Sequence, residues 1–135
     1  MSKAFIDSNV ILYLLSHDAV KADKAESILQ AGGVISVQVL NEVVSVCQRK
    51  LKMPWDEIDA VLQAVKASVH IVPLTETSHE LAVQLCKRYQ LSFYDAHICS
   101  AALVAGSTVL LSEDMQEGMV VDNLVVKNPF NKETR

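Results

Sequence analysis

Four acidic residues are candidates for one shared site: Asp7, Glu42, Asp95 and Asp114. Asp7 and Asp114 follow predicted strands, Asp95 stands at the start of a predicted helix, and Glu42 lies on the helix after the second strand. Carboxylates that gather closely repel one another, so that without a cation at least one of them takes up a proton through a raised pKa. No lysine or arginine is spaced to pair with Glu42 or Asp95 within its own helix. Oxygen ligands favour Mg²⁺ or Mn²⁺, and no histidine or cysteine cluster supports Zn²⁺. The acids therefore predict a magnesium or manganese site.

The chemistry that such a site most often serves is phosphoryl transfer. A bound metal turns water into a nucleophile, orients an in-line attack on a phosphodiester and stabilises charge on the leaving oxygen. We expect Asp7 and Asp95 to be direct ligands, because both stand on rigid elements. Glu42 is expected to bind the same metal or to orient the attacking water, and Asp114 to hold a second ion.

The elements that must position these acids alternate between strands and helices. Strands are predicted at residues 3–6, 34–36, 69–74, 108–111 and 124–127, the last as an edge strand. Helices are predicted at residues 9–15, 20–31, 37–51, 54–67, 77–89 and 94–105. This alternation predicts an α/β fold, a three-layer α/β/α sandwich with a mainly parallel central sheet of four to five strands. Ligands of such sheets bind at the carboxyl ends of the strands, where Asp7 and Asp114 would lie.

Each acid taken singly also has a structural explanation. Asp7 and Asn9 are residue types that cap helices, and Asp95 has the spacing of a capping box. Asp114 fits a turn, and Glu42 fits the solvated side of a helix. Two observations favour a shared site instead: Glu42 lies at the margin of an apolar stripe, and Asp95 precedes an almost wholly apolar helix. An acid buried there without a cationic partner is costly.

Composition limits the classes of protein that remain. The chain has 135 residues, of which 50% are hydrophobic and 21% charged, and this balance predicts one globular domain spanning residues 1–135. No apolar run is long enough to span a membrane and no secretory signal is evident, so we expect a cytoplasmic protein. Cys47, Cys86 and Cys99 lie far apart in apolar patterns. They are expected to be buried free thiols rather than a disulfide framework.

Four segments resemble the motifs of PIN-domain nucleases in order and spacing: FIDSNVILYLL, QVLNEVVSV, SFYDAHICSAAL and LLSEDM. Within that family, a small chain of this kind most resembles the VapC-like toxins of bacterial toxin-antitoxin systems. The resemblance implies a ribonuclease dependent on Mg²⁺ or Mn²⁺ that leaves a 5′-phosphate and a 3′-hydroxyl. It also implies a homodimer held inactive by a small antitoxin. Carried over by position, the metal-binding acids are Asp7, Glu42, Asp95 and Asp114, with Asn9 and Ser112 in support.

The chain departs from the family pattern after Asp114. Many members continue with a further acid or asparagine and an aromatic residue, whereas this chain reads EDMQEGMVVDN. Glu117 and Asp122 are the residues that would substitute, and both also fit ordinary surface positions. Tyr13 and Tyr94 are aromatic residues near the motifs, and we expect both, with Phe93, to pack in the core or at a dimer surface rather than to stack on bases.

The net charge of −4 at first sight opposes an RNA substrate. The four proposed ligands account for that whole charge, and bound divalent ions would reverse its sign locally. Two basic groups are candidates for an RNA path, Arg49 with Lys50 and Lys52, and Lys87 with Arg88, although each group also suits a helix end. The same acidic cleft would attract a basic antitoxin segment that places arginine or lysine among the carboxylates.

Three other interpretations compete. A haloacid-dehalogenase-like phosphatase needs a second acid two residues after the first, where this chain has Asn9. A receiver-like signalling domain would need paired acids near the first strand and a lysine near the last. The serious alternative is a PIN-like fold that acts as a non-catalytic RNA-binding or assembly module. Retention of all four acids argues against that alternative.

Overall fold

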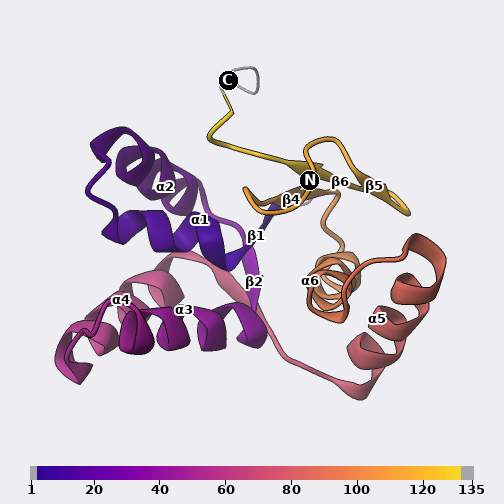
Figure 1. Ribbon diagram of the computed structural model, residues 1–135, viewed down its shortest axis with the longest axis horizontal. Coiled ribbons are helices and arrows are strands. Elements are labelled where there is room, and N and C mark those ends of the chain that lie inside the picture. The colour runs from indigo at the N-terminus through magenta and orange to yellow at the C-terminus, as the bar shows by residue number, and fades with distance from the viewer. Residues whose placement is uncertain (1–2, 132–135) are drawn as a thin grey trace.

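A computed structural model describes residues 3–131 of the chain, as strands and helices in alternation (Figure 1). The strands are β1 (Phe5–Ile6), β2 (Val34–Ser36), β3 (His70–Val72), β4 (Val109–Leu111), β5 (Val120–Val121) and β6 (Leu124–Lys127). The helices are α1 (Ser8–Leu12), α2 (Ala19–Ala31), α3 (Val37–Arg49), α4 (Trp55–Ser68), α5 (Glu76–Tyr89) and α6 (Phe93–Val104), with a 3₁₀ turn η1 (Tyr13–Leu15). The first two and last four residues of the predicted domain lie outside the described residues.

The strands form one sheet in the order β3-β2-β1-β4-β6-β5. All neighbouring strands are parallel except β5, which pairs antiparallel with β6. Figure 1 places α1 to α4 on one side of the sheet and α5 and α6 on the other. The predicted α/β sandwich with a mainly parallel sheet is therefore confirmed.

The sheet has one strand more than the sequence predicted. Residues 124–127 do form a strand, but the prediction that it is an edge strand is wrong, because β6 lies between β4 and β5. The additional strand β5 joins β6 through a turn at Asp122 and Asn123, and Asp122 has a φ of 53°. Asparagine and aspartate tolerate this left-handed conformation, which matches the twist of two antiparallel strands joined by a two-residue turn. The short hairpin closes one edge of the sheet.

Local signals explain why the elements begin where they do. Asp7 caps α1, and Asp18 caps α2 by accepting from the backbone N–H groups of Val20 and Lys21. The predicted helix 9–15 is instead the five-residue α1 followed by η1, so its last turn tightens. Gly33 stands directly before β2, and a side chain there is excluded because a Cβ would lie 2.7 Å from Ile6 Cδ1. The start of β2 can thus pack directly against β1.

The core lies on both faces of the sheet and includes most of α6. Phe5, Ile35 and Leu110, from three adjacent strands, are fully buried. Cys47 and Cys99 are buried, Cys86 is half-buried, and all three thiols are free, as the sequence predicted. Helix α6 is buried because it packs between α5 and the sheet, which fixes the first turn where Asp95 stands. None of the described helices has the length and apolar character needed to cross a membrane.

Candidate functional site

The order of the strands reverses at β1 and β4. From β1 the chain proceeds outward to β2 and β3, then returns to the other side of β1 to form β4 and β6. At such a reversal the connections leave in opposite directions and open a crevice at the carboxyl ends of the two strands. Asp7 follows β1, and its backbone N–H donates to the carbonyl of Leu111 at the end of β4, at 2.9 Å. The structure therefore places Asp7 at this crevice.

Asp7 is only 3% exposed, and both of its carboxylate oxygens accept hydrogen bonds. Oδ1 accepts from the backbone N–H of Ser8 at 2.8 Å. Oδ2 accepts from the hydroxyl of Ser112 at 2.9 Å and from the side-chain amide of Asn9 at 3.2 Å. These contacts include the predicted cap of α1, but they also fix the carboxylate against the residue that follows β4.

The environment of Asp7 disfavours its negative charge. Burial raises the pKa of this carboxyl above its ordinary value, and the hydrogen bonds from Ser112 and Ser8 only partly oppose that rise. The negative charges of Asp114 and Asp95 raise the pKa further. Neither of the two ion pairs within residues 3–131 involves Asp7. The site thus has surplus negative charge around a buried carboxylate, which is the condition that a cation relieves.

The other three predicted acids have free carboxylates, and Asp114 and Asp95 are near enough to act on the charge of Asp7. Asp95 stands in the first turn of α6, where its backbone N–H donates to the Ser92 hydroxyl at 3.2 Å, and it is half-buried. Glu42 is half-buried on α3, and Asp114 is exposed after β4. Among the described residues no donor or cation binds the carboxylate of any of the three. The second half of the predicted capping box at Asp95 is absent, so that its carboxylate is available to a ligand.

Tyr94 indicates how these acids converge. The pKa of its hydroxyl is raised to about 12, chiefly by burial and also by the charges of Asp7, Glu42 and Asp95, while a contact with Ser8 acts in the opposite direction. Three of the four acids are therefore close enough to act on one phenol, while Asp114 acts on Asp7. Tyr94 is half-buried beside the site, rather than simply part of the core.

Asn9 joins the buried acid to the loop after β4. Its amide nitrogen donates to Asp7 Oδ2 and, at 3.3 Å, to Ser112 Oγ, while its Oδ1 accepts from the backbone N–H of Glu113 at 2.9 Å. The predicted supporting residues Asn9 and Ser112 thus both contact Asp7. They hold the start of the loop that carries Asp114.

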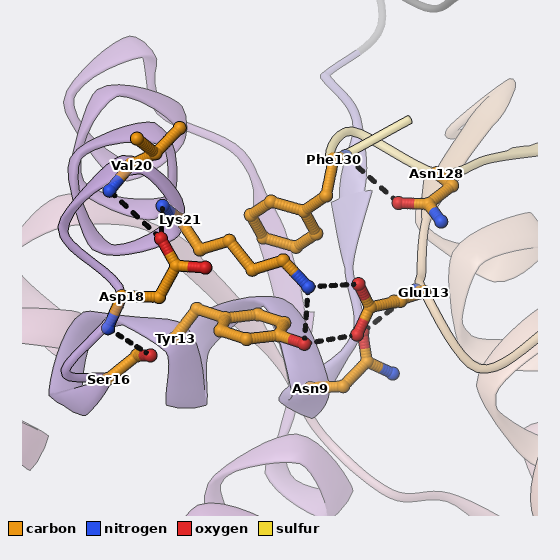
Figure 2. A network of polar contacts seen from close by, with 9 residues as sticks. All are labelled: Asn9, Tyr13, Ser16, Asp18, Val20, Lys21, Glu113, Asn128 and Phe130. Atoms are coloured by element: carbon orange, nitrogen blue, oxygen red, sulfur yellow. Dashed lines mark hydrogen bonds and ion pairs between the residues drawn. The ribbon is translucent and has the colours of Figure 1, made fainter. Parts of the chain in front are cut away.

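Figure 2 shows a polar cluster beside Asn9 that the sequence did not predict. Lys21 Nζ lies 3.1 Å from Glu113 Oε2 and 3.1 Å from the Tyr13 hydroxyl, and that hydroxyl donates to Glu113 Oε1. The Lys21 ammonium also lies 4.6 Å from the centroid of the Tyr13 ring, which packs edge-on against Phe130. Tyr13, expected in the core or at a dimer surface, is a contact between η1 and the loop after β4. We call Tyr13, Lys21 and Glu113 the loop clamp.

Glu117 and Asp122 have structural contacts away from this crevice. Glu117 Oε1 accepts from the backbone N–H of Asn128 at 2.9 Å. Asp122, in the turn before β6, accepts from Arg88 at 3.0 Å and from the Tyr89 hydroxyl at 2.8 Å. Both carboxylates therefore serve the β5-β6 edge in this structure.

Two pockets adjoin the acids. One of about 460 Å³ runs between α1, η1 and the end of α3, and Asn9, Tyr13 and Asp114 are among its lining residues. The other, of about 400 Å³, lies along α3 and is lined by Glu42, Ser45, Val46, Arg49 and Lys50. Val46 lines both, so the two pockets are neighbours on the surface.

The donor set suits a hard divalent cation in its chemistry. The available atoms are carboxylate oxygens and the hydroxyl of Ser112, which are ligands and supports typical of Mg²⁺ and Mn²⁺. No set of three or more His, Cys, Asp or Glu side chains within residues 3–131 is already gathered tightly enough to hold an ion. The acids would thus have to draw closer together around an ion.

The fold and the site define the class of protein: an α/β sandwich with acidic residues at the reversal of strand order between β1 and β4. Comparison of the sequence with family models identifies the family. Residues 4–116 match the family model of the PIN domain. The chain therefore belongs to the PIN-domain family, and the resemblance noted in the sequence is confirmed. No curated protein is significantly similar to the chain in sequence.

Solved structures with the same fold include toxins. A toxin-antitoxin complex from Klebsiella pneumoniae contains a chain with a TM-score of 0.72 and 20% identity, over 94% of this chain and 98% of that one. VapBC2 from Rickettsia felis, bound to a DNA fragment of its promoter, contains a chain with a TM-score of 0.68 and 18% identity, over 93% of this chain and 97% of that one. The sarcin-ricin loop cleaving toxin VapC20 of Mycobacterium tuberculosis has a TM-score of 0.63 and 17% identity, over 82% of this chain and 89% of that one. These matches show the shared fold.

Proposed function

We propose that the chain is a ribonuclease dependent on Mg²⁺ or Mn²⁺ and the toxin of a toxin-antitoxin pair. The observation that carries the proposal is Asp7, a buried carboxylate whose pKa is raised by burial and by the charges of Asp114 and Asp95. A purely structural helix cap does not need two further acids beside it. A metal-binding acid does, because one carboxylate alone holds Mg²⁺ or Mn²⁺ weakly.

In this proposal Asp7 and Asp95 hold the metal, with Glu42 and Asp114 completing the acidic site. When bound, the ion would supply Lewis acidity and an activated water for hydrolysis of a phosphodiester. Ser112 and Asn9 fix the Asp7 carboxylate by donating to Oδ2, so one of its oxygens keeps its orientation. The half-buried Glu42 would bind the same metal or orient the attacking water. Burial of Asp7 limits the competing hydration of the site.

The toxin assignment is supported by the solved structures that share the fold, since they include a VapC toxin and two toxin-antitoxin complexes. The proposed partner is a small antitoxin whose arginine or lysine enters the acidic site and neutralises it. A cytoplasmic homodimer is the proposed working form. Light scattering of the purified protein tests the dimer, and a small reading frame next to the gene tests the pairing.

The central experiment is cleavage of a mixed RNA pool by the purified protein in Mn²⁺, Mg²⁺ or EDTA. Asp7→Asn and Asp95→Asn are expected to abolish cleavage while remaining folded. Asp56→Asn is the matched control, because Asp56 is also an acid in the first turn of a helix but is exposed on α4. Its cleavage should equal that of the wild type.

Metal binding measured by calorimetry separates the remaining outcomes. Binding by the wild type but not by Asp7→Asn, together with metal-dependent cleavage, supports the nuclease. Binding of metal without cleavage of the pool indicates a narrow choice of RNA. If the wild type binds neither metal ion, the nuclease proposal fails and the non-catalytic RNA-binding or assembly module remains.

A further inference from the structure

Arg49 and Lys50 form a basic pair at the end of α3, on the pocket that also contains Glu42. Both side chains are exposed, and neither pairs with an acidic side chain within residues 3–131. Lys52, which the sequence grouped with them, does not line this pocket. The pocket therefore carries one acid of the candidate site at one end and two unpaired cations at the other.

Two other cations near functional segments are already engaged, Lys21 and Arg88. Lys21 is bound to Glu113 and Tyr13 in the loop clamp. Arg88, from the second basic group predicted by sequence, is paired with Asp122. In Figure 1, α5, which carries that group, lies across the sheet from α3. The Arg49 and Lys50 pair is thus the basic group that shares a surface with a candidate metal ligand.

The spacing along α3 sets the distance between the two functions. Glu42, Ser45 and Arg49 follow one another at helical spacings of three and four residues, which places them on one face of the helix. Arg49 Nη1 donates to Ser45 Oγ at 3.4 Å, so that the guanidinium leans back along the helix toward Glu42. A rise of 1.5 Å per residue separates the backbones of Glu42 and Arg49 by about 10 Å. At that separation, one RNA strand can present one phosphate to the acids and a neighbouring phosphate to Arg49.

We propose that Arg49 and Lys50 form a subsite for a backbone phosphate of the RNA strand, beside the phosphate that is cut at the acids. This inference rests on the proposed function and assigns the direction in which the substrate leaves the site, along α3. Arginine suits the task because its planar guanidinium binds two phosphate oxygens at once, and Lys50 adds a mobile point charge. Because the contact is to phosphate, the subsite binds RNA of any sequence.

A purely structural role would predict different behaviour. A cation in the last turn of a helix interacts favourably with the helix dipole, and Arg49 is in the last turn of α3. That role changes stability slightly and leaves RNA binding unaffected. Binding of RNA and its dependence on salt are therefore the readouts that distinguish a phosphate subsite from a helix cap.

The test uses full-length protein carrying Asp7→Asn, so that RNA is not cleaved while binding is measured. The affinity for a fluorescent single-stranded RNA is measured by anisotropy over a series of salt concentrations, with and without Arg49→Ala and Lys50→Ala together. The matched control is Lys24→Ala with Lys66→Ala, which removes the same charge from exposed positions on α2 and α4. Arg49→Lys tests whether charge alone restores binding.

We expect the Arg49 and Lys50 variant to bind RNA several-fold more weakly, whatever the RNA sequence. The slope of log affinity against log salt should become shallower by about 0.7 for each phosphate of a single strand that the protein no longer neutralises. The control variant should keep the slope of its parent, and Arg49→Lys should keep most of the affinity. An unchanged slope in the Arg49 and Lys50 variant, or a parent protein that binds no RNA, overturns the subsite.

Failure of this inference is distinguishable from failure of the nuclease proposal. If the wild type shows metal-dependent cleavage but the Arg49 and Lys50 variant has an unchanged salt slope, the subsite is rejected and the nuclease proposal stands. If the salt slope depends on Arg49 and Lys50 but the wild type binds no metal, the subsite is supported and the nuclease proposal is rejected. In the cleaving protein, removal of the pair should raise KM and leave kcat nearly constant, because the phosphate is bound equally in the ground and transition states.

Discussion

Asp7 must be buried at the end of β1 and must also carry a negative charge to bind a metal ion. In the metal-free protein these two requirements conflict. Its position at the end of β1 buries it, and burial raises the pKa of its carboxyl. The folded state therefore keeps a proton on Asp7 at pH values where the unfolded chain has lost it. The resulting stabilisation is complete below the ordinary carboxyl pKa and is lost as pH rises through the raised pKa of the folded state.

The first prediction is that Asp7→Asn abolishes cleavage but makes the metal-free protein more resistant to heat at neutral pH. Asparagine carries no charge to bury and can still accept from the N–H of Ser8. The advantage over the wild type should disappear at acid pH, where Asp7 is protonated. Thermal unfolding of both proteins in EDTA across a pH series measures this difference, and a variant less stable than wild type at neutral pH contradicts it.

Ser112 is the second residue whose role is specific. It is fully buried, and its hydroxyl donates to Asp7 Oδ2 at 2.9 Å. Ser112→Ala should lower metal affinity or activity by about 10- to 100-fold, as the loss of a hydrogen bond that orients a metal ligand does. Ser107→Ala is the matched control, since Ser107 is also a buried serine but bonds the carbonyl of Lys3. Equal losses of affinity in both variants would show that Ser112 acts only through packing.

At the scale of elements, the loop clamp ties η1 and α2 to the loop after β4. Glu113, the residue before Asp114, accepts from Tyr13 and Lys21 and gives its backbone N–H to Asn9. Tyr13→Phe should leave the protein folded and reduce metal affinity or activity less than Ser112→Ala does, because Asn9 still holds the loop. Calorimetry with Mn²⁺ measures the effect. A larger loss than that of Ser112→Ala would mean that the clamp, rather than Asn9, positions Asp114.

The elements themselves were largely predictable because local chemistry marks their ends. The strand at residues 34–36 and the helix after it followed from apolar runs and periodicity, and Asp18 and Ser92 cap helices as their types suggest. The strand β5 was missed because only two residues form it. Its signal was present nonetheless, since the segment VVDNLVV places two apolar runs around Asp122 and Asn123.

At the scale of the whole molecule, the positions of the acids followed from topology, whereas their contacts did not. A parallel sheet brings strand ends to one edge, so Asp7 and Asp114 could be placed together from the sequence. The loop clamp could not, because Lys21 and Glu113 are 92 residues apart and neither stands in a recognisable pattern. Contacts between distant surface side chains depend on the exact packing of α2 against the sheet, which no local signal encodes.

The whole chain should also respond to the metal through its stability. The acids repel one another only when the protein is folded, so an ion that binds the folded state stabilises it by mass action. At an ion concentration about 100 times the Kd, this stabilisation is about 2.7 kcal/mol, or a rise in Tm of roughly 10 °C for a chain of this size. Scanning calorimetry with increasing Mn²⁺ tests it, with Asp7→Asn and Asp56→Asn measured beside the wild type. The rise should persist in Asp56→Asn and vanish in Asp7→Asn; an equal rise in all three proteins would place the ion away from Asp7.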